Sequence, residues 1–335
     1  SGVLWVGTRS GGLSRYDRAT DTFVSYQHDP SVPRRIPSHE VLAVHQDSRG
    51  VLRVGTAGGM AELDRASGSF RYVPFSQEAR GRSVEIVAID EDEMGQVWAA
   101  SRKMVYHLNT STGVLETLVN EELAKSLPSA QINQIYSEKK NVLWVVSDVI
   151  GLFRLDLASG AVERHLPSTG VFKVLRDKWG TMWAAVSGGV ARLDESSGGR
   201  RFEVFAHNPY DPDTVSQNDA ISLLEDASGI IWAGTYSGGL NKLVPGSRWF
   251  ETYRHVPGNP DTLPGKEVSA VHLGRDGSLW VGLRYAGLAR MDRSRRVAER
   301  FKHDPADPGS LAEDQINCVM EDSKGRIWVG TVESG

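Results

Sequence analysis

Hydrophobic and polar residues alternate in short runs along this chain, and the runs return at a nearly constant interval. An apolar-Trp-apolar triplet occurs seven times, and Leu52-Arg53-Val54 is an eighth copy with Arg in the Trp place. Successive copies lie 39 to 49 residues apart, about 46 on average, which is in the range of propeller blades. The central residues of the copies are Trp5, Arg53, Trp98, Trp144, Trp183, Trp232, Trp280 and Trp328.

Each repeat predicts four short β-strands. In most copies an acid stands six residues before the Trp position and a Gly three before it, as in Asp226 and Gly229. This spacing makes a tight turn, because Asp bonds the backbone at its start and Gly supplies positive φ at its end. The turn joins a first run, such as Ile221 to Leu224, to the Trp strand. A Gly-Gly turn then leads to a third strand, such as Val190 to Asp194, and a Ser/Thr-Gly turn leads to a fourth, such as Phe70 to Val73.

Serial four-stranded units predict an all-β, seven-bladed β-propeller, because each small sheet can bury its faces only against its neighbours. We interpret the Trp as the filler between blades and expect residues 1–335 to form one propeller domain. The pattern gives 29 strands, one more than seven closed blades need. Gln315 to Met320 could complete the N-terminal blade; the alternatives are eight blades with the last incomplete, or a longer repeat array. The nearest helix-like segment is Asn120 to Leu127.

Composition narrows the class of function. Glycine makes up 35 of 335 residues, and the predicted turns account for the excess. The net charge of -4 argues against nucleic acid or an anionic membrane as partner. One cysteine, Cys318, excludes an internal disulfide and a cysteine zinc site, so we expect no metal and no cofactor. No apolar run reaches the roughly 18 residues of a membrane helix, and we expect no direct membrane insertion.

Catalytic motifs are missing from the sequence. There is no Gly-x-Ser-x-Gly elbow, no phosphate loop and no His-Glu-x-x-His motif, so we expect no enzyme activity in this chain. The Asp-x-x-Gly spacing differs from the Asp-x-Gly of sialidases, and we interpret it as turn chemistry. The acidic run Asp90 to Gly95 lacks the remaining ligands of a calcium loop, and a solvated turn is the better interpretation.

The repeat core, Asp-x-x-Gly-x-apolar-Trp-apolar-Gly-Thr-x-x-Gly-Gly-Leu, resembles the two-component regulator propeller repeat. Asp226 to Leu240 and Asp322 to Thr331 match it closely, and His303 to Leu311 is similar to the family's HDPxDPxSL segment. The resemblance covers almost the whole chain. The units that depart most, since they lack Gly-Thr, are those of Trp98, Trp144 and Trp183.

The resemblance implies a periplasmic sensor region of a hybrid two-component system or a related receptor. Such propellers frequently respond to carbohydrates, and their output comes from downstream signalling domains of the same protein, such as a histidine kinase or a diguanylate cyclase. The chain contains none of those domains, so the resemblance implies a fragment of a longer sensor protein.

Propeller ligands usually lie over the central channel, on loops between the second and third strands and on the linkers to each innermost strand. Arg, Tyr and Asp in such loops suit a sugar or a carboxylate, through bidentate hydrogen bonds and apolar ring faces. Arg284 and Tyr285 are favoured because they are adjacent and bulky. The candidate ligand-binding residues are Arg9, His39, Arg102, Asp148, Tyr236, Arg284 and Tyr285.

The linkers also carry pairs that begin each innermost strand, namely His39-Glu40, Asn218-Asp219 and Lys266-Glu267. We expect Asn218 and Asp219 to bond the linker backbone. The histidines at equivalent repeat positions are expected to be structural, because one ligand site rarely needs the same residue in several blades. They are His28, His207 and His303.

The leading hypothesis is a non-catalytic sensing propeller that binds an oligosaccharide or another small polar ligand at the channel mouth. The second hypothesis, from another class, is a protein-interaction or homodimerisation platform without a small-molecule ligand. A propeller lyase or glycosidase is third.

Overall fold

The computed structural model describes residues 3–32, 34–76, 85–118, 131–138, 141–194, 201–244 and 250–332. The named elements of these residues are all β-strands, and among them no helix has the length and apolar character to cross a membrane. The chain divides into two compact units, Val3–Ser168 and Thr169–Gly335. The helix-like segment Asn120 to Leu127 lies outside the described residues.

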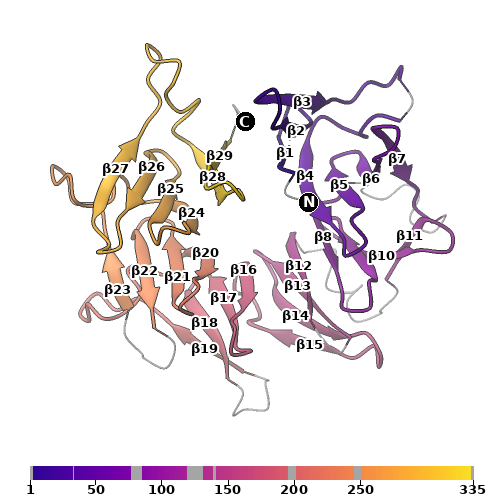
Figure 1. Ribbon diagram of the computed structural model, residues 1–335. Coiled ribbons are helices and arrows are strands. Elements are labelled where there is room, and N and C mark those ends of the chain that lie inside the picture. The colour runs from indigo at the N-terminus through magenta and orange to yellow at the C-terminus, as the bar shows by residue number, and fades with distance from the viewer. Residues whose placement is uncertain are drawn as a thin grey trace. The chain divides into compact units, whose positions relative to one another are not determined.

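The first unit contains four antiparallel sheets, each built from strands that follow one another in the sequence (Figure 1). Blade 1 is three-stranded and the next three sheets are four-stranded. Blade 1 consists of β1 (Trp5–Gly7), β2 (Leu13–Asp17) and β3 (Thr22–Tyr26), and blade 2 of β4 (Val41–Gln46), β5 (Leu52–Thr56), β6 (Gly59–Asp64) and β7 (Ser69–Val73). Blade 3 consists of β8 (Ala88–Glu91), β9 (Val97–Ala100), β10 (Val105–Asn109) and β11 (Val114–Thr117), and blade 4 of β12 (Ile132–Glu138), β13 (Val142–Ser147), β14 (Gly151–Asp156) and β15 (Val162–His165).

The second unit has three four-stranded sheets and a two-stranded one. Blade 5 consists of β16 (Val171–Arg176), β17 (Met182–Val186), β18 (Gly189–Asp194) and β19 (Arg201–Phe205), and blade 6 of β20 (Ala220–Glu225), β21 (Ile231–Thr235), β22 (Leu240–Leu243) and β23 (Phe250–Tyr253). Blade 7 consists of β24 (Val268–Leu273), β25 (Leu279–Leu283), β26 (Gly287–Met291) and β27 (Val297–Phe301), and the terminal sheet of β28 (Ile316–Glu321) and β29 (Ile327–Thr331).

The predicted class, an all-β propeller of seven four-stranded blades, is confirmed. Six blades are complete four-stranded sheets, while blade 1 has three strands and the terminal sheet has two. The described residues form the 29 strands that the repeat pattern predicts. The completion of the N-terminal blade by β28 stays a prediction, as does the single-domain organisation.

The acid of each turn does more than close the turn. In blade 6, Asp226 Oδ1 accepts the backbone N–H groups of Ser228 and Ile230 at 2.9 and 3.0 Å, as the pattern predicts, and Gly229 follows with φ of 89°. The second oxygen, Oδ2, accepts Nε1 of Trp232 at 2.9 Å. One carboxylate therefore fixes both the turn and the indole six residues later. The same acid–Trp bond occurs in Asp92–Trp98, Glu138–Trp144, Asp177–Trp183 and Asp322–Trp328.

The Trp side chains pack between neighbouring blades, as predicted. Trp232 of blade 6 is fully buried and belongs to a cluster with Leu279 and Met291 of blade 7. Trp183 of blade 5 is 1% exposed and clusters in the same way with Ile231 and Phe250 of blade 6. Each indole thus supplies apolar area that a four-stranded sheet cannot bury alone.

Blade 2 replaces the Trp with a buried ion network. Arg53 is 3% exposed, and its Nη1 donates to Asp47 Oδ2, the oxygen that holds the indole in other blades. Arg53 Nε donates to Glu62 Oε1 at 3.1 Å, and the other oxygen of Glu62 pairs with Arg71. Burial alone would raise the pKa of Asp47, but hydrogen bonds from Arg53 and from the Val51 N–H outweigh it and hold the pKa below its ordinary value.

Successive turns are also joined by a second acid, in a contact that we call the turn clasp. The acid is the Glu at the end of a blade's innermost strand. Its carboxylate accepts the backbone N–H of the second residue in the turn of the preceding blade. The clasp side chains belong to residues outside the predicted site. The three pairs are Ser48–Glu91 at 2.6 Å, Lys178–Glu225 at 3.0 Å and Arg275–Glu321 at 2.8 Å.

Candidate ligand site on the strand loops

The loops between second and third strands are shaped by a hydroxyl at the end of the second strand. In blade 6, the buried Thr235 donates through Oγ1 to the Gly239 carbonyl at 2.8 Å and accepts the Gly238 N–H at 3.0 Å. This pair of bonds closes a tight loop that leaves Tyr236 exposed. Thr8 makes the corresponding bonds with Gly12 and Gly11.

Serine takes the role of Thr in some of the units that lack Gly-Thr. Ser101 Oγ accepts the Met104 N–H at 3.0 Å, and Ser147 Oγ accepts the Ile150 N–H at 3.2 Å. Both serines are fully buried. Both units form complete four-stranded sheets. The units of Trp183 and Trp280 do so as well with Val186 and Leu283 at this position, so the hydroxyl shapes the loop where it occurs but a blade can form without it.

Three of the predicted site residues come together in the second unit. The guanidinium of Arg284 lies 5.9 Å from the ring centroid of Tyr236 and 6.0 Å from that of Tyr285. The rings are 44% and 60% exposed. Cation–π contacts of this kind are worth about 0.5–1 kcal/mol at exposed sites. We call Tyr236, Arg284 and Tyr285 the rim cluster; it joins blade 6 to blade 7.

The backbone beneath the rim cluster is tied to the linkers. The Arg284 N–H donates to the Glu267 carbonyl at 3.0 Å, and the Tyr236 N–H donates to the Asp219 carbonyl at 2.8 Å. The Asp219 carboxylate accepts Nε2 of Gln217 at 2.9 Å. Glu267 Oε2 is buried and has no hydrogen-bond partner within the described residues. The cluster is therefore held on a backbone that is bonded to both linkers.

The predicted site residues of the first unit have separate partners. Arg9 Nε lies 4.0 Å from Glu40 Oε1, and the ring of His39 meets His28 edge-on at 5.8 Å. Arg102 Nε lies 3.7 Å from Glu85 Oε2. Arg9, His39, Arg102 and Asp148 are all exposed. Their role in ligand binding stays a prediction, as does that of the rim cluster.

The recurrent histidines are structural, as predicted. His207 Nδ1 donates to the Val215 carbonyl at 2.7 Å. The backbone N–H of His207 donates to Asn218 Oδ1 at 2.7 Å, which is the linker bond expected of Asn218. Sequence reasoning missed His255, which makes the same bond with Leu263; its spacing to Leu263 equals that of His207 to Val215. The equivalent bonds join His28 to Ile36 and His303 to Leu311.

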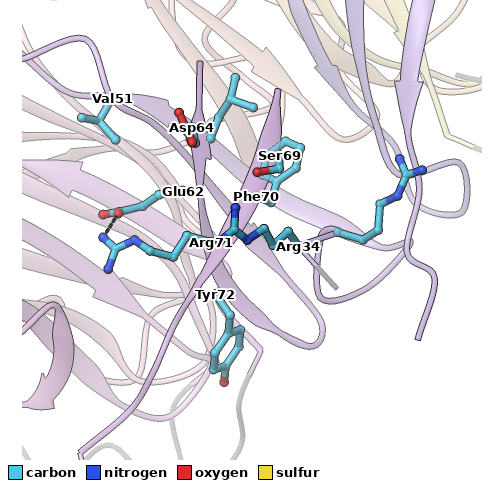
Figure 2. Close-up of a pocket in the computed structure, with 10 residues that line it drawn as sticks. Arg34, Val51, Glu62, Asp64, Ser69, Phe70, Arg71 and Tyr72 are labelled. Atoms are coloured by element: carbon cyan, nitrogen blue, oxygen red, sulfur yellow. Dashed lines mark hydrogen bonds and ion pairs between the residues drawn. The ribbon is translucent and has the colours of Figure 1, made fainter. Parts of the chain in front are cut away.

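A cavity of about 620 Å³ lies on the outer strands of blade 2 (Figure 2). Figure 2 shows the ion pair of Glu62 and Arg71 and, nearby, the side chains of Arg34 and Phe70. None of the residues lining this cavity was a candidate on sequence grounds. The signal that could have found it is Arg53, the one Arg in the series of Trp positions.

The comparison with protein families matches one short segment of the chain. The sequence profile of the family described as "Two component regulator propeller" matches residues 310–333, which confirms the predicted resemblance. A comparison with curated proteins finds no match.

Solved structures share the fold. The extracellular domain of BT3049 from B. thetaiotaomicron, assigned as a hybrid two-component system, is 23% identical with a TM-score of 0.58 over 99% of this chain. The extracellular domain of BT4673 from the same organism is 18% identical with a TM-score of 0.64 over 88% of this chain. Virginiamycin B lyase from Staphylococcus aureus is 12% identical with a TM-score of 0.57, and the match covers 84% of this chain and 88% of the lyase.

The chain spans only part of the sensor domains that it resembles. The matches cover 42% of the BT3049 domain and 37% of the BT4673 domain.

Proposed function

We propose that this chain, with its two-component regulator propeller repeat, is a non-catalytic ligand-sensing domain of a two-component signal-transduction receptor. The support is the repeat match at residues 310–333 together with the fold that the chain shares with two extracellular domains of such systems. By the same likeness we assign it to the periplasm. Its output would come from signalling domains of the same protein, such as a histidine kinase.

The ligand we propose is a small polar molecule such as an oligosaccharide, bound at the rim cluster. The observation that carries this assignment is the Arg284 guanidinium between two exposed tyrosine rings. Ring faces suit the apolar C–H face of a sugar, while the guanidinium donates to its oxygens.

The chemistry of the rim cluster suits binding better than catalysis. Its functional groups are one guanidinium and two phenols. Acid–base catalysis needs a donor and an acceptor with tuned pKa values on either side of a reacting bond, and an arginine guanidinium offers hydrogen-bond donors only. The lyase of the same fold is 12% identical, a likeness that concerns the fold alone.

The test is calorimetry of the chain against a panel of neutral and acidic oligosaccharides. For a sugar that binds, we expect Arg284→Gln and Tyr285→Ala each to weaken binding about 10-fold, which corresponds to roughly 1.4 kcal/mol. Tyr210→Ala is the matched control, since Tyr210 is a linker tyrosine that is 94% exposed. This variant should bind the sugar with unchanged affinity.

A sugar that binds all three variants as tightly as the unaltered chain would refute the assignment to the rim cluster. Absence of any sugar binding, with a stable dimer in light scattering, would favour the homodimerisation platform instead.

A further inference from the structure

The outer strands of blade 2 carry a second concentration of cationic side chains. The cavity of about 620 Å³ is bounded by the linker residues Arg34 and Arg35, by Glu62 of β6, and by Arg71 and Tyr72 of β7 (Figure 2). Asp64 lines it as well, so three arginines and two carboxylates border the cavity in a chain whose net charge is -4. The cavity therefore carries a small excess of positive charge against the balance of the whole molecule.

The cavity continues toward the position that the Trp takes in other blades. A second hollow of about 260 Å³ shares Val51, Glu62 and Arg71 with it and is also bounded by Arg53 and by Leu108 of β10. In blades 5 and 6 the indole packs against the next blade at this position. Blade 2 has a charged side chain there, so the space toward blade 3 is lined by polar groups.

The acids of the cavity are already engaged. Glu62 accepts from Arg53 and Arg71. Asp64 accepts the Ala66 N–H at 3.0 Å and the Ser67 hydroxyl at 2.7 Å within its own turn. Arg34 and Arg35 are exposed and make no ion pair within the described part of the chain. Two guanidinium groups thus remain to face a ligand.

The linker holds Arg34 in a fixed place. Its φ is 68°, in the left-handed region that non-Gly residues seldom adopt. Its carbonyl accepts the Phe70 N–H at 2.9 Å, so the linker is bonded to β7. Phe70 is 1% exposed and closes the inner side, while Tyr72 is 45% exposed. Tyr72 therefore lines the same cavity as Arg34 and Arg35.

We propose that this cavity is a second binding site, specific for a carboxylate attached to a ring. The guanidinium groups of Arg34 and Arg35 bind the carboxylate, for which the planar fork of Arg is well matched. The Tyr72 ring packs against the ring of the ligand. An acidic sugar and an aromatic acid share this chemistry, and the experiment separates them. The site is independent of the rim cluster and of the sensing role proposed above.

The experiment is calorimetry of the 335-residue chain with a glucuronate-ended disaccharide, its glucose-ended counterpart and benzoate. We expect at least one of the two acids to bind more than 10-fold tighter than the neutral disaccharide. The affinity for that acid should fall as the salt concentration rises. Binding of the disaccharide alone identifies an acidic sugar as the ligand, and binding of benzoate alone identifies an aromatic acid.

The double variant Arg34→Gln/Arg35→Gln should bind the acid at least 10-fold more weakly, because each lost guanidinium removes charge-assisted hydrogen bonds. Arg65→Gln is the matched control: Arg65 is an exposed arginine next to Asp64 whose side chain does not line this cavity. It should change the affinity less than 2-fold, and so should Tyr285→Ala in the rim cluster.

Three results would overturn the proposal. They are binding of the neutral disaccharide as tight as that of both acids, no binding of either acid, and an equal loss in Arg65→Gln and the double variant. A melting temperature within about 2 °C of the unaltered chain shows that each variant is folded. Loss of binding in Tyr285→Ala alone would assign the acid to the rim cluster instead.

Discussion

Replacing Trp232 with Ala tests whether the indole is the structural link between blades. The side chain is fully buried, its ring centroid lies 6.0 Å from that of Tyr253, and Arg295 lies 5.0 Å above it. Burial of a Trp removes on the order of 150–250 Å² from water, worth about 4–6 kcal/mol at roughly 25 cal/mol per Å². Measured Trp→Ala changes in cores cost about 3–5 kcal/mol. We therefore expect about 4 kcal/mol.

The substitution also leaves Asp226 Oδ2 without the indole donor that it now accepts at 2.9 Å. Trp232→Phe separates the two contributions, because it keeps most of the apolar area and removes only this hydrogen bond. An unsatisfied buried acceptor costs about 1–3 kcal/mol. Trp232→Phe should therefore lose less stability than Trp232→Ala, but more than a surface change.

The assay is the melting temperature followed by circular dichroism. For domains of 150–250 residues, 1 kcal/mol corresponds to about 2–4 °C, so Trp232→Ala should lower the melting temperature by about 8–16 °C. Trp179→Ala is the control, since Trp179 is 58% exposed at a turn of blade 5. A shift under about 2 °C for Trp232→Ala, or one no larger than that of the control, would refute the role of the indole.

Two further predictions concern charge. Arg53→Met should lower the free energy of unfolding, measured in urea, by about 3–5 kcal/mol, because it leaves Asp47 and Glu62 buried without their shared cation. Adding Asp47→Asn and Glu62→Gln should recover most of that loss. A triple variant no more stable than Arg53→Met would contradict the reasoning. Hydrogen bonds from the Ser278 hydroxyl and N–H, and then from Arg290, lower the pKa of Asp276 from 3.8 to about 2. Its ionised form therefore stabilises the fold above about pH 4, and this contribution is lost as pH falls toward 2. Ser278→Ala should raise the pKa of Asp276 toward 3.8 in an NMR titration of the carboxyl, and no movement would contradict the assigned cause.

The strands could be predicted from the sequence because their signals are local. Alternation of side chains and an acid three residues before a Gly both act within one hairpin, and they place β20 and β21 to within a residue or two. The role of the second carboxylate oxygen of Asp226 could not be predicted. The pattern explains why Asp begins the turn, but the bond to Trp232 depends on where the strand after the turn carries the indole.

The site was predictable only in part, for the same reason. Arg284 and Tyr285 stand out because they are bulky neighbours in one loop, but the approach of Arg284 to Tyr236 joins loops 48 residues apart. That approach depends on how one blade is rotated against the next, which no local pattern encodes. The cavity beside Arg34 was missed because linker arginines look like solvated loop residues until the strands behind them are in place.

The turn clasp has a consequence for how freely the sequence can vary. The acid accepts a hydrogen bond from a backbone N–H. The residues that donate it are Ser48, Lys178 and Arg275, which differ in size and charge. The backbone bond does not depend on the side chain at this position, but each of the three side chains adds a bond of its own to the next blade: Ser48 Oγ donates to Glu91 Oε1 at 2.7 Å, Lys178 Nζ to the Ala227 carbonyl at 3.4 Å, and Arg275 Nη1 to the Ser323 carbonyl at 2.9 Å. A substitution there therefore removes the side-chain part of the link and keeps the backbone part, so the strength of the contact between two turns can change by single substitutions while the acid still accepts the same N–H.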